Sequence, residues 1–275
     1  MSKLISVPIP TGKDHRRSDA SLWDHVLVVE PPYSRGPCRE LHTEEVHLYS
    51  VPLVASAECI GNLEKYLAPD EWKRAGSFRT AALRDAFILG RGLLRTILGR
   101  YSRLSPSAVG LAYGARGKPH LLNNKRLRFN LSHSGGHALF ALALDREIGV
   151  DIEHLRPMSN CEEIARRVFS VQEYRDLLSL ARHQRGTAFF TCWTRKEAYI
   201  KAVGDGLSLP LDSFRVSLLP GETPALVAPK DPRVWSLHDV SPGPGFVAAL
   251  AGEGTEMKVR RWTFATLEEC ARYFA

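Results

Sequence analysis

The hydrophobic positions of this chain follow a helical period in two long segments. From about residue 80 to 101 the apolar residues recur every three or four positions, which predicts an amphipathic helix. A second long helix is predicted from about 187 to 203, and Gly204 and Gly206 would end it. A shorter helix is expected to open at Pro69, because proline suits the first helical turn.

Short apolar runs elsewhere in the chain predict strands. These runs lie at 46–51, 127–131, 138–144, 148–153, 214–218, 234–239 and 246–251. Short polar connections between 127 and 153 favour an antiparallel meander. After Pro157 the pattern becomes helical, with a capping-box signature at Ser170–Glu173. The sequence therefore predicts an α/β or α+β fold with mainly antiparallel sheets packed with helices.

The first 45 residues differ from the rest of the chain. They are polar and interrupted by prolines, so we expect an N-terminal extension with little structure of its own. The remainder of the 275 residues is long enough for one large domain or two small ones. No run of 18 apolar residues or secretory segment is found, so we expect no membrane span. Five scattered cysteines without a C-x-x-C pair argue against a disulfide framework or a zinc site and favour the cytoplasm.

The formal charge of +7 suggests an anionic ligand or partner, although a soluble basic surface would give the same value. Arg84, Arg91 and Arg95 fall on one stripe of the predicted helix. A solvated helix face usually mixes charge signs, so this stripe favours phosphate binding. The chain has no P-loop, dinucleotide-binding or G-x-S-x-G motif, and the classes defined by these motifs are excluded.

Asp151 and Glu153 lie two residues apart in a predicted strand. Both carboxylates would then share one face, and Ile152 would point into the core. Two neighbouring carboxylates repel each other unless a cation or proton lies between them, and Mg²⁺ prefers such oxygen ligands. The alternative is an acidic strand end exposed to water.

The segment Trp193–Lys201 places charged and aromatic residues on one short helix. Glu197 and Lys201 are spaced i,i+4, which could be an ordinary surface ion pair. The aromatic neighbours instead suggest a partly buried wall. Glu197 would then be a third metal ligand or a general base, and Lys196 and Lys201 would neutralise phosphate oxygens.

Two further segments offer hydrogen-bond donors to an anion. Residues 130–136 combine Ser132, His133 and two glycines after a strand, which allows donors to converge on an anion or forms a plain polar turn. Gly117-Lys118-Pro119 is a stiff turn that presents one lysine.

These motifs follow one another in a recognisable order. They are Gly117-Lys118-Pro119, Phe129–Gly135, Gly149–Glu153, Phe169-Ser170, Glu173-Tyr174, Trp193–Lys201 and Gly206–Asp212. In this order they closely resemble the 4′-phosphopantetheinyl transferases of the large, surfactin-synthetase-activating (Sfp) type. The resemblance covers about residues 46–265.

The resemblance implies a Mg²⁺-dependent enzyme that moves the phosphopantetheine arm of coenzyme A onto a serine of an apo acyl or peptidyl carrier protein. Adenosine 3′,5′-bisphosphate would be released. It also implies two similar, pseudo-two-fold-related halves, at 46–148 and 149–275, with the active site in the cleft between them. We expect a cytoplasmic monomer that binds neither nucleic acid nor membrane.

The resemblance also implies residue roles. Asp151, Glu153 and Glu197 would bind Mg²⁺ together with the coenzyme A pyrophosphate. Glu197, or a water that it orients, would accept the proton of the carrier serine, and Lys201 would hold the pyrophosphate. The nucleotide would be held by His133, Arg74 and Arg79 at the 3′-phosphate and by Gly117, Lys118, Pro119 and Ser132 in the nucleotide pocket.

Two positions depart from the family pattern, and two rival functions stay open. Glu71 and His154 lie where basic residues occur in the family. The clustered carboxylates, lysine and positive charge would also suit a Mg²⁺-dependent nuclease. A non-catalytic module that binds coenzyme A or a nucleotide is the other alternative.

Overall fold

The computed structural model describes residues 26–28, 40–204, 208–227 and 231–275. Two runs of elements follow each other in the same order. The first run is β2 (Glu45–Pro52), α1 (Ala57–Glu64), α2 (Pro69–Gly76), α3 (Ala81–Ser102), β3 (Leu111–Tyr113), β4 (Pro119–Leu121), β5 (Leu127–Ser134) and β6 (His137–Leu144). The second run is β7 (Ile148–His154), α4 (Cys161–Val168), α5 (Val171–Ser179), α6 (Arg182–Val203), β8 (Arg215–Val216), β9 (Leu226–Val227), β10 (Trp235–Asp239) and β11 (Phe246–Glu253). Single 3₁₀ turns lie at Pro106–Ala108 and Leu211–Ser213.

The two runs build sheets of the same strand order. Each half has a three-stranded antiparallel unit, β2-β6-β5 in the first and β7-β11-β10 in the second. Each half also has one helix of 22 residues, α3 or α6. The fold is therefore a mixed α+β structure, as the sequence pattern predicted, in which one architecture occurs twice, as the resemblance implied.

The C-terminal elements return to the first half. β12 (Lys258–Thr263) pairs in parallel with β2, and β1 (Val26–Val28) pairs in parallel with β12. The last helix, α7 (Leu267–Phe274), packs on α3 and β2. We propose that the halves divide at the turn before β7, and that residues 258–275 complete the first half.

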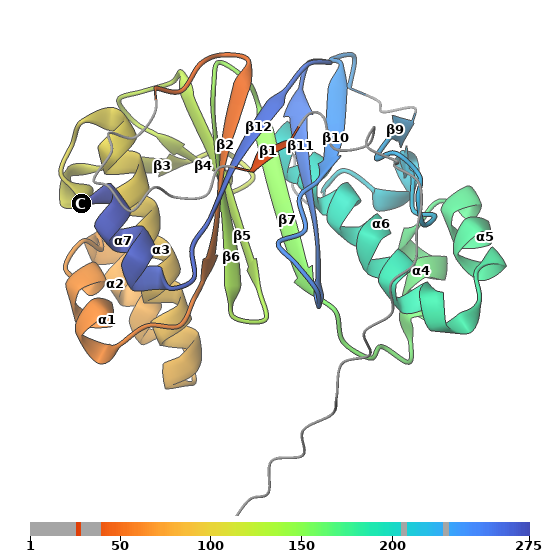
Figure 1. Cartoon of the computed structure of the whole chain (residues 1–275), viewed down its shortest axis with the longest axis horizontal. Helices are drawn as coiled ribbons and strands as arrows, with labels where there is room; N and C mark the ends of the chain where they lie inside the picture. The colour runs from red at the N-terminus through yellow and green to blue at the C-terminus, as the bar shows by residue number, and fades with distance from the viewer. Residues whose placement is uncertain (1–25, 29–39, 205–207, 228–230) are drawn as a thin grey trace, which may run out of the picture.

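Helices cover the outer faces of the two sheets, which pack against each other at the centre (Figure 1). The shared core contains Val46 and Leu48 of the first sheet and Val150 and Ile152 of the second, each at most 1% exposed. Separate apolar clusters lie under α3 and under α6. Full burial of each such aliphatic side chain contributes about 1.5–3 kcal/mol, so the central layer fixes the two halves against each other.

Most predicted elements are confirmed, and one pairing is wrong. Both long helices are present, and the capping box closes with Glu173 N–H donating to Ser170 Oγ at 3.3 Å. The predicted meander holds only for β5 and β6, because β7 pairs with β11 in the other sheet. The strand β12 and the helix α7 were not predicted.

Two predictions lie outside the described residues. They are the structure of most of the N-terminal extension, at 1–25 and 29–39, and the role of Gly206 in ending the second long helix. Within the described ranges, no helix is both long and apolar enough to cross a membrane.

Candidate active site

The site is built where α6 lies directly on β7. A Cβ atom added at Gly149 would lie only 2.2 Å from the carbonyl oxygen of Ala198 and 2.3 Å from the amide nitrogen of Ala202. Only glycine, which has no Cβ, permits the helix backbone to approach the strand so closely. This contact brings the last turns of α6 beside the acidic residues of β7.

Asp151 and Glu153 share the face of β7 that Gly149 presents to α6, because alternate residues of a strand point the same way. Ile152 lies on the opposite face and is 1% exposed in the central core. The predicted alternation along this strand is therefore confirmed.

The carboxylate of Asp151 lies in a buried polar cluster. The Lys201 ammonium donates to Asp151 Oδ1 at 2.6 Å, and the Ser132 hydroxyl donates to the same oxygen at 2.9 Å. The other oxygen, Asp151 Oδ2, is buried and has no hydrogen-bond partner. A buried acceptor without a donor is costly, and such an atom in a native structure points to a missing ligand or water.

Glu153 and Glu197 add negative charge beside Asp151. The Ser134 hydroxyl donates to Glu153 Oε2 at 2.9 Å, and Arg156 Nη1 lies 3.2 Å from the same oxygen. Burial raises the pKa of Glu197, and repulsion by Asp151 and Glu153 raises it further, opposed by Lys201. Burial likewise raises the pKa of Asp151, opposed chiefly by Lys201. Glu197 on α6 therefore lies within electrostatic range of the two acidic residues of β7.

These features fit a divalent cation. The donor set consists of carboxylate oxygens, which Mg²⁺ prefers, and one of these oxygens is orphaned. The Lys201 ammonium already lies at Asp151, which shows that this position attracts positive charge. In the parts of the chain that the structure describes, no group of three Asp, Glu, His or Cys side chains is placed so that it could hold a metal ion.

Lys196, which we predicted to neutralise phosphate, faces the interior of the second half instead. Its side chain is fully buried and pairs with Glu173 at 2.8 Å. Its ammonium also donates to the carbonyl oxygens of Leu211 and Phe214, at 2.6 and 2.7 Å. With all three donors occupied inside the core, Lys196 has a structural position, and we leave it out of the proposed site.

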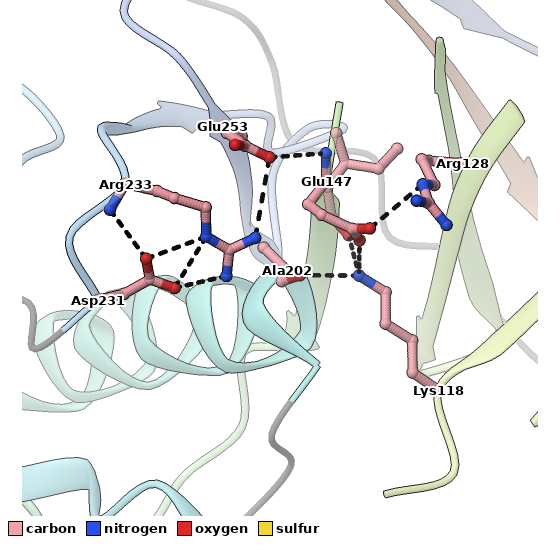
Figure 2. A network of polar contacts seen from close by, with 8 residues as sticks. Lys118, Arg128, Glu147, Ala202, Asp231, Arg233 and Glu253 are labelled. Atoms are coloured by element: carbon pink, nitrogen blue, oxygen red, sulfur yellow. Dashed lines mark hydrogen bonds and ion pairs between the residues drawn. The ribbon is translucent and has the colours of Figure 1, made fainter. Parts of the chain in front are cut away.

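Lys118 is held in a network between the two halves (Figure 2). Its ammonium donates to Glu147 Oε2 at 2.7 Å and to the Ala202 carbonyl at the end of α6 at 2.8 Å. Arg128 of β5 also contacts Glu147, at 3.2 Å. Burial lowers the pKa of Lys118, and Glu147 opposes the shift. Lys118 therefore holds the turn at 117–119 against the end of α6.

The arginine stripe of α3 does not form a phosphate site. Arg95 is buried and donates to Glu71 Oε2 at 2.6 Å, and Arg91 lies 3.5 Å from the same carboxylate. Arg84 pairs with its neighbour Asp85. The premise of the prediction, a stripe of unpaired positive charge, is wrong, because Glu71 contacts Arg91 and Arg95 and Asp85 contacts Arg84.

The remaining predicted residues are placed as follows. His133 is largely exposed, but neighbouring protein atoms still desolvate part of its ring; this desolvation, followed by repulsion from Lys201, lowers its pKa. Arg74 and Arg79 are exposed around the turn between α2 and α3. Gly117 has a φ of 82° in the β3–β4 turn, and Pro119 opens β4.

Sequence reasoning missed three residues that organise the site. Gly149 permits the contact of α6 with β7, and Asn130 and Ser134 bind β7 from β5. The signal for Asn130 and Ser134 was their two-residue spacing from Ser132, which places all three residues on one face of a strand.

Comparisons with known proteins give the family of this chain. The chain is 40% identical over 247 residues to the 4′-phosphopantetheinyl transferase HetI of Nostoc sp., and the match covers 88% of this chain and all of HetI. The chain belongs to the 4′-phosphopantetheinyl transferase family. The family model of the 4′-phosphopantetheinyl transferase superfamily matches residues 147–251, which include β7 and α6.

Two further matches are less complete. The 4′-phosphopantetheinyl transferase Sfp of Bacillus subtilis is 36% identical over 153 residues, covering 56% of this chain and 67% of Sfp. The solved holo-(acyl-carrier-protein) synthase of Bacillus anthracis, in complex with coenzyme A, is 22% identical. The match covers 40% of this chain and 96% of the synthase chain, with a TM-score of 0.33. A likeness this distant adds nothing to the assignment.

Proposed function

We propose that this 4′-phosphopantetheinyl transferase moves the phosphopantetheine arm of coenzyme A to a serine of an apo acyl or peptidyl carrier protein, with the chemistry at the contact of β7 and α6. The observation that carries the proposal is the buried carboxylate of Asp151, which pairs with Lys201, has one orphaned oxygen and lies within electrostatic range of Glu153 and Glu197. We further propose that it is of the surfactin-synthetase-activating type and acts as a monomer. The reason is that β5 of the first half and β7 and α6 of the second half, all in one chain, supply the site.

Asp151, Glu153 and Glu197 are the residues that would hold Mg²⁺. The bound ion would stabilise the negative charge that develops on the pyrophosphate oxygens as the bond to adenosine 3′,5′-bisphosphate breaks. The protein residues supply the rest of the arrangement, because in-line transfer of this kind depends on positioning and charge stabilisation.

Glu197 is the proposed proton acceptor, directly or through a water that it orients. The serine oxygen would form the new bond to the phosphorus nearer the pantetheine arm, and its proton would pass to the Glu197 carboxylate. Burial and the neighbouring carboxylates raise the pKa of Glu197, so its ionised form is a stronger base than an exposed glutamate. Lys201, which lies 2.6 Å from Asp151, would hold a pyrophosphate oxygen at the same position.

The nucleotide is expected on the side of β5 and the β3–β4 turn. A pocket of about 410 Å³ there is lined by Lys118, Pro119 and Arg128 among others, and we propose it for the nucleotide, with Gly117 shaping the turn. His133, close to the charge of Lys201, is the proposed contact of the 3′-phosphate, and the exposed Arg74 and Arg79 are its proposed helpers.

The test is transfer to carrier proteins. The chain is incubated with coenzyme A, Mg²⁺ and a panel of apo acyl and peptidyl carrier proteins, and each carrier is weighed by mass spectrometry. We expect a mass gain of one phosphopantetheine, and a rate that falls by orders of magnitude in Asp151→Ala and Glu197→Ala. Glu163→Ala is the matched control, because this carboxylate is exposed on α4 and contacts Arg167. No mass gain on any carrier by the folded chain would reject the proposal.

A further inference from the structure

Two strands from different sheets lie side by side at the site. β5 ends the sheet of the first half, and β7 ends the sheet of the second half. The backbone of β5 pairs with β6, and the backbone of β7 pairs with β11. The edge of β7 that faces β5 therefore needs other partners for its backbone N–H groups.

Side chains of β5 supply these partners at every second residue. Asn130 Oδ1 accepts the N–H of Val150 at 2.9 Å. Ser132 Oγ accepts the N–H of Ile152 at 3.4 Å, and Ser134 Oγ accepts the N–H of His154 at 3.1 Å. The spacing is constant because residues 130, 132 and 134 share one face of β5 and residues 150, 152 and 154 share one direction of β7. Polar side chains thus replace a backbone ladder between the halves.

The two serines of this ladder also bind the two acidic residues. Ser132 donates to Asp151 Oδ1 and Ser134 donates to Glu153 Oε2, both at 2.9 Å. A hydroxyl has one hydrogen and two lone pairs. At Ser132 the lone pairs accept from the Ile152 N–H and from Lys201 at 3.1 Å, so the hydrogen is left for the carboxylate. Each serine therefore points its hydrogen at a carboxylate because the backbone of β7 occupies its acceptor side.

Resting on the proposed function, we propose that Ser132 and Ser134 are positioning residues for the cation-binding carboxylates. They fix one oxygen of Asp151 and one oxygen of Glu153. For Asp151 this leaves Oδ2, the buried oxygen without a partner, for the cation. The same serines also bind the backbone of β7, so the position of one half relative to the other helps to set the positions of the two carboxylates. The resemblance led us to expect Ser132 in the lining of the nucleotide pocket; here its hydroxyl is proposed to hold Asp151.

Ser134 gives the sharper test of the two. Its partner His154 is exposed, so water can replace the lost acceptor when Ser134 is changed to alanine. Ser132 is 8% exposed and serves three partners, so its loss is more disruptive. Substitution of a residue that orients a metal ligand typically lowers metal affinity or activity about 10- to 100-fold. We expect Ser134→Ala to weaken binding of the cation about tenfold.

The experiment measures cation binding and transfer separately. Binding of Mn²⁺ to the chain with coenzyme A present is followed by electron paramagnetic resonance, without a carrier protein. The Mg²⁺ concentration for half-maximal transfer is then measured with an apo carrier that the wild type modifies. Ser134→Ala should raise both the dissociation constant for Mn²⁺ and the Mg²⁺ concentration for half-maximal transfer about tenfold, with little change in the KM for coenzyme A. Ser134→Thr should restore the wild-type values because it keeps the hydroxyl. Ser236→Ala is the control, because this hydroxyl on β10 donates only to the Gly252 carbonyl.

The outcomes separate this inference from the proposed function. If the wild type transfers phosphopantetheine and folded Ser134→Ala binds Mn²⁺ as the wild type does, the inference is overturned and the function stands. If the wild type modifies no carrier, the function fails, while the Mn²⁺ measurement still decides the role of the serines. Should Ser134→Ala not fold, Ser132→Ala is measured in the same way. Loss of folding in both variants would assign the serines a structural role and overturn the proposal.

Discussion

Gly149 is the position where a single methyl group should damage the site most selectively. Alanine there would place Cβ 2.2 Å from the Ala198 carbonyl oxygen, whereas ordinary contact begins at about 3.4 Å. The obstacle is helix backbone, which cannot rotate away, so α6 must move from β7 by about 1 Å. Overpacking of this kind costs about 1–3 kcal/mol. We expect the upper end of this range, or a fall in Tm of about 6–12 °C at roughly 2–4 °C per kcal/mol.

The same displacement should lower transfer activity. A misplacement of about 1 Å at a reacting site can lower the rate about 100-fold, and here it separates Lys201 and Glu197 from Asp151. Differential scanning calorimetry and the carrier-loading assay measure the two effects on Gly149→Ala. Gly186→Ala is the control on the same helix, because its Cβ meets open space and alanine favours a helix by up to about 1 kcal/mol. Wild-type Tm and rate in Gly149→Ala would show that the contact of α6 with β7 does not depend on this glycine.

Two further predictions concern buried groups away from the site. Lys196→Met should lower the free energy of unfolding, measured in urea, by about 3–5 kcal/mol, because it leaves the buried Glu173 carboxylate without its charged partner. If this decrease is no larger than the decrease caused by Lys258→Met, at an exposed lysine, the prediction is wrong. Burial lowers the pKa of His47 to about 4, opposed by Glu45, so as pH falls below about 6.5 the unfolded chain takes up this proton before the folded one does. Between about pH 7.5 and pH 5, His47 should lower the free energy of unfolding by about 2 kcal/mol. In urea titrations the decrease over this pH range should be smaller by this amount in His47→Gln, and an equal decrease in the two proteins would contradict the assignment.

The local pattern of the sequence predicted the elements well where one face of an element is apolar. The helix at 81–102 and the strand at 148–154 were both found from periodicity, and the opposite orientations of Asp151 and Ile152 were found as well. The pairing of β7 was not predictable in this way. Short connections favour a hairpin with β6, but the central core and the β5 side chains place β7 in the second sheet.

The site was predicted less completely than the fold, for reasons of three-dimensional context. Lys196 and Lys201 flank Glu197 in sequence, yet one faces the core and the other faces β7. Because α6 is buried on most of its surface, the distribution of apolar residues does not reveal which lysine faces which way. The close approach at Gly149 depends on a helix 50 residues later in the chain, so no local signal marks it.

The proposed chemistry requires that β7 and α6 together bind one divalent cation against the pyrophosphate of coenzyme A. Crystals grown with coenzyme A and Mn²⁺, measured at the manganese absorption edge, test this requirement. We predict one anomalous peak bound by oxygens of Asp151, Glu153 and Glu197. A peak bound elsewhere on the chain, or one with the Glu197 carboxylate turned away from it, would contradict the proposed cation site.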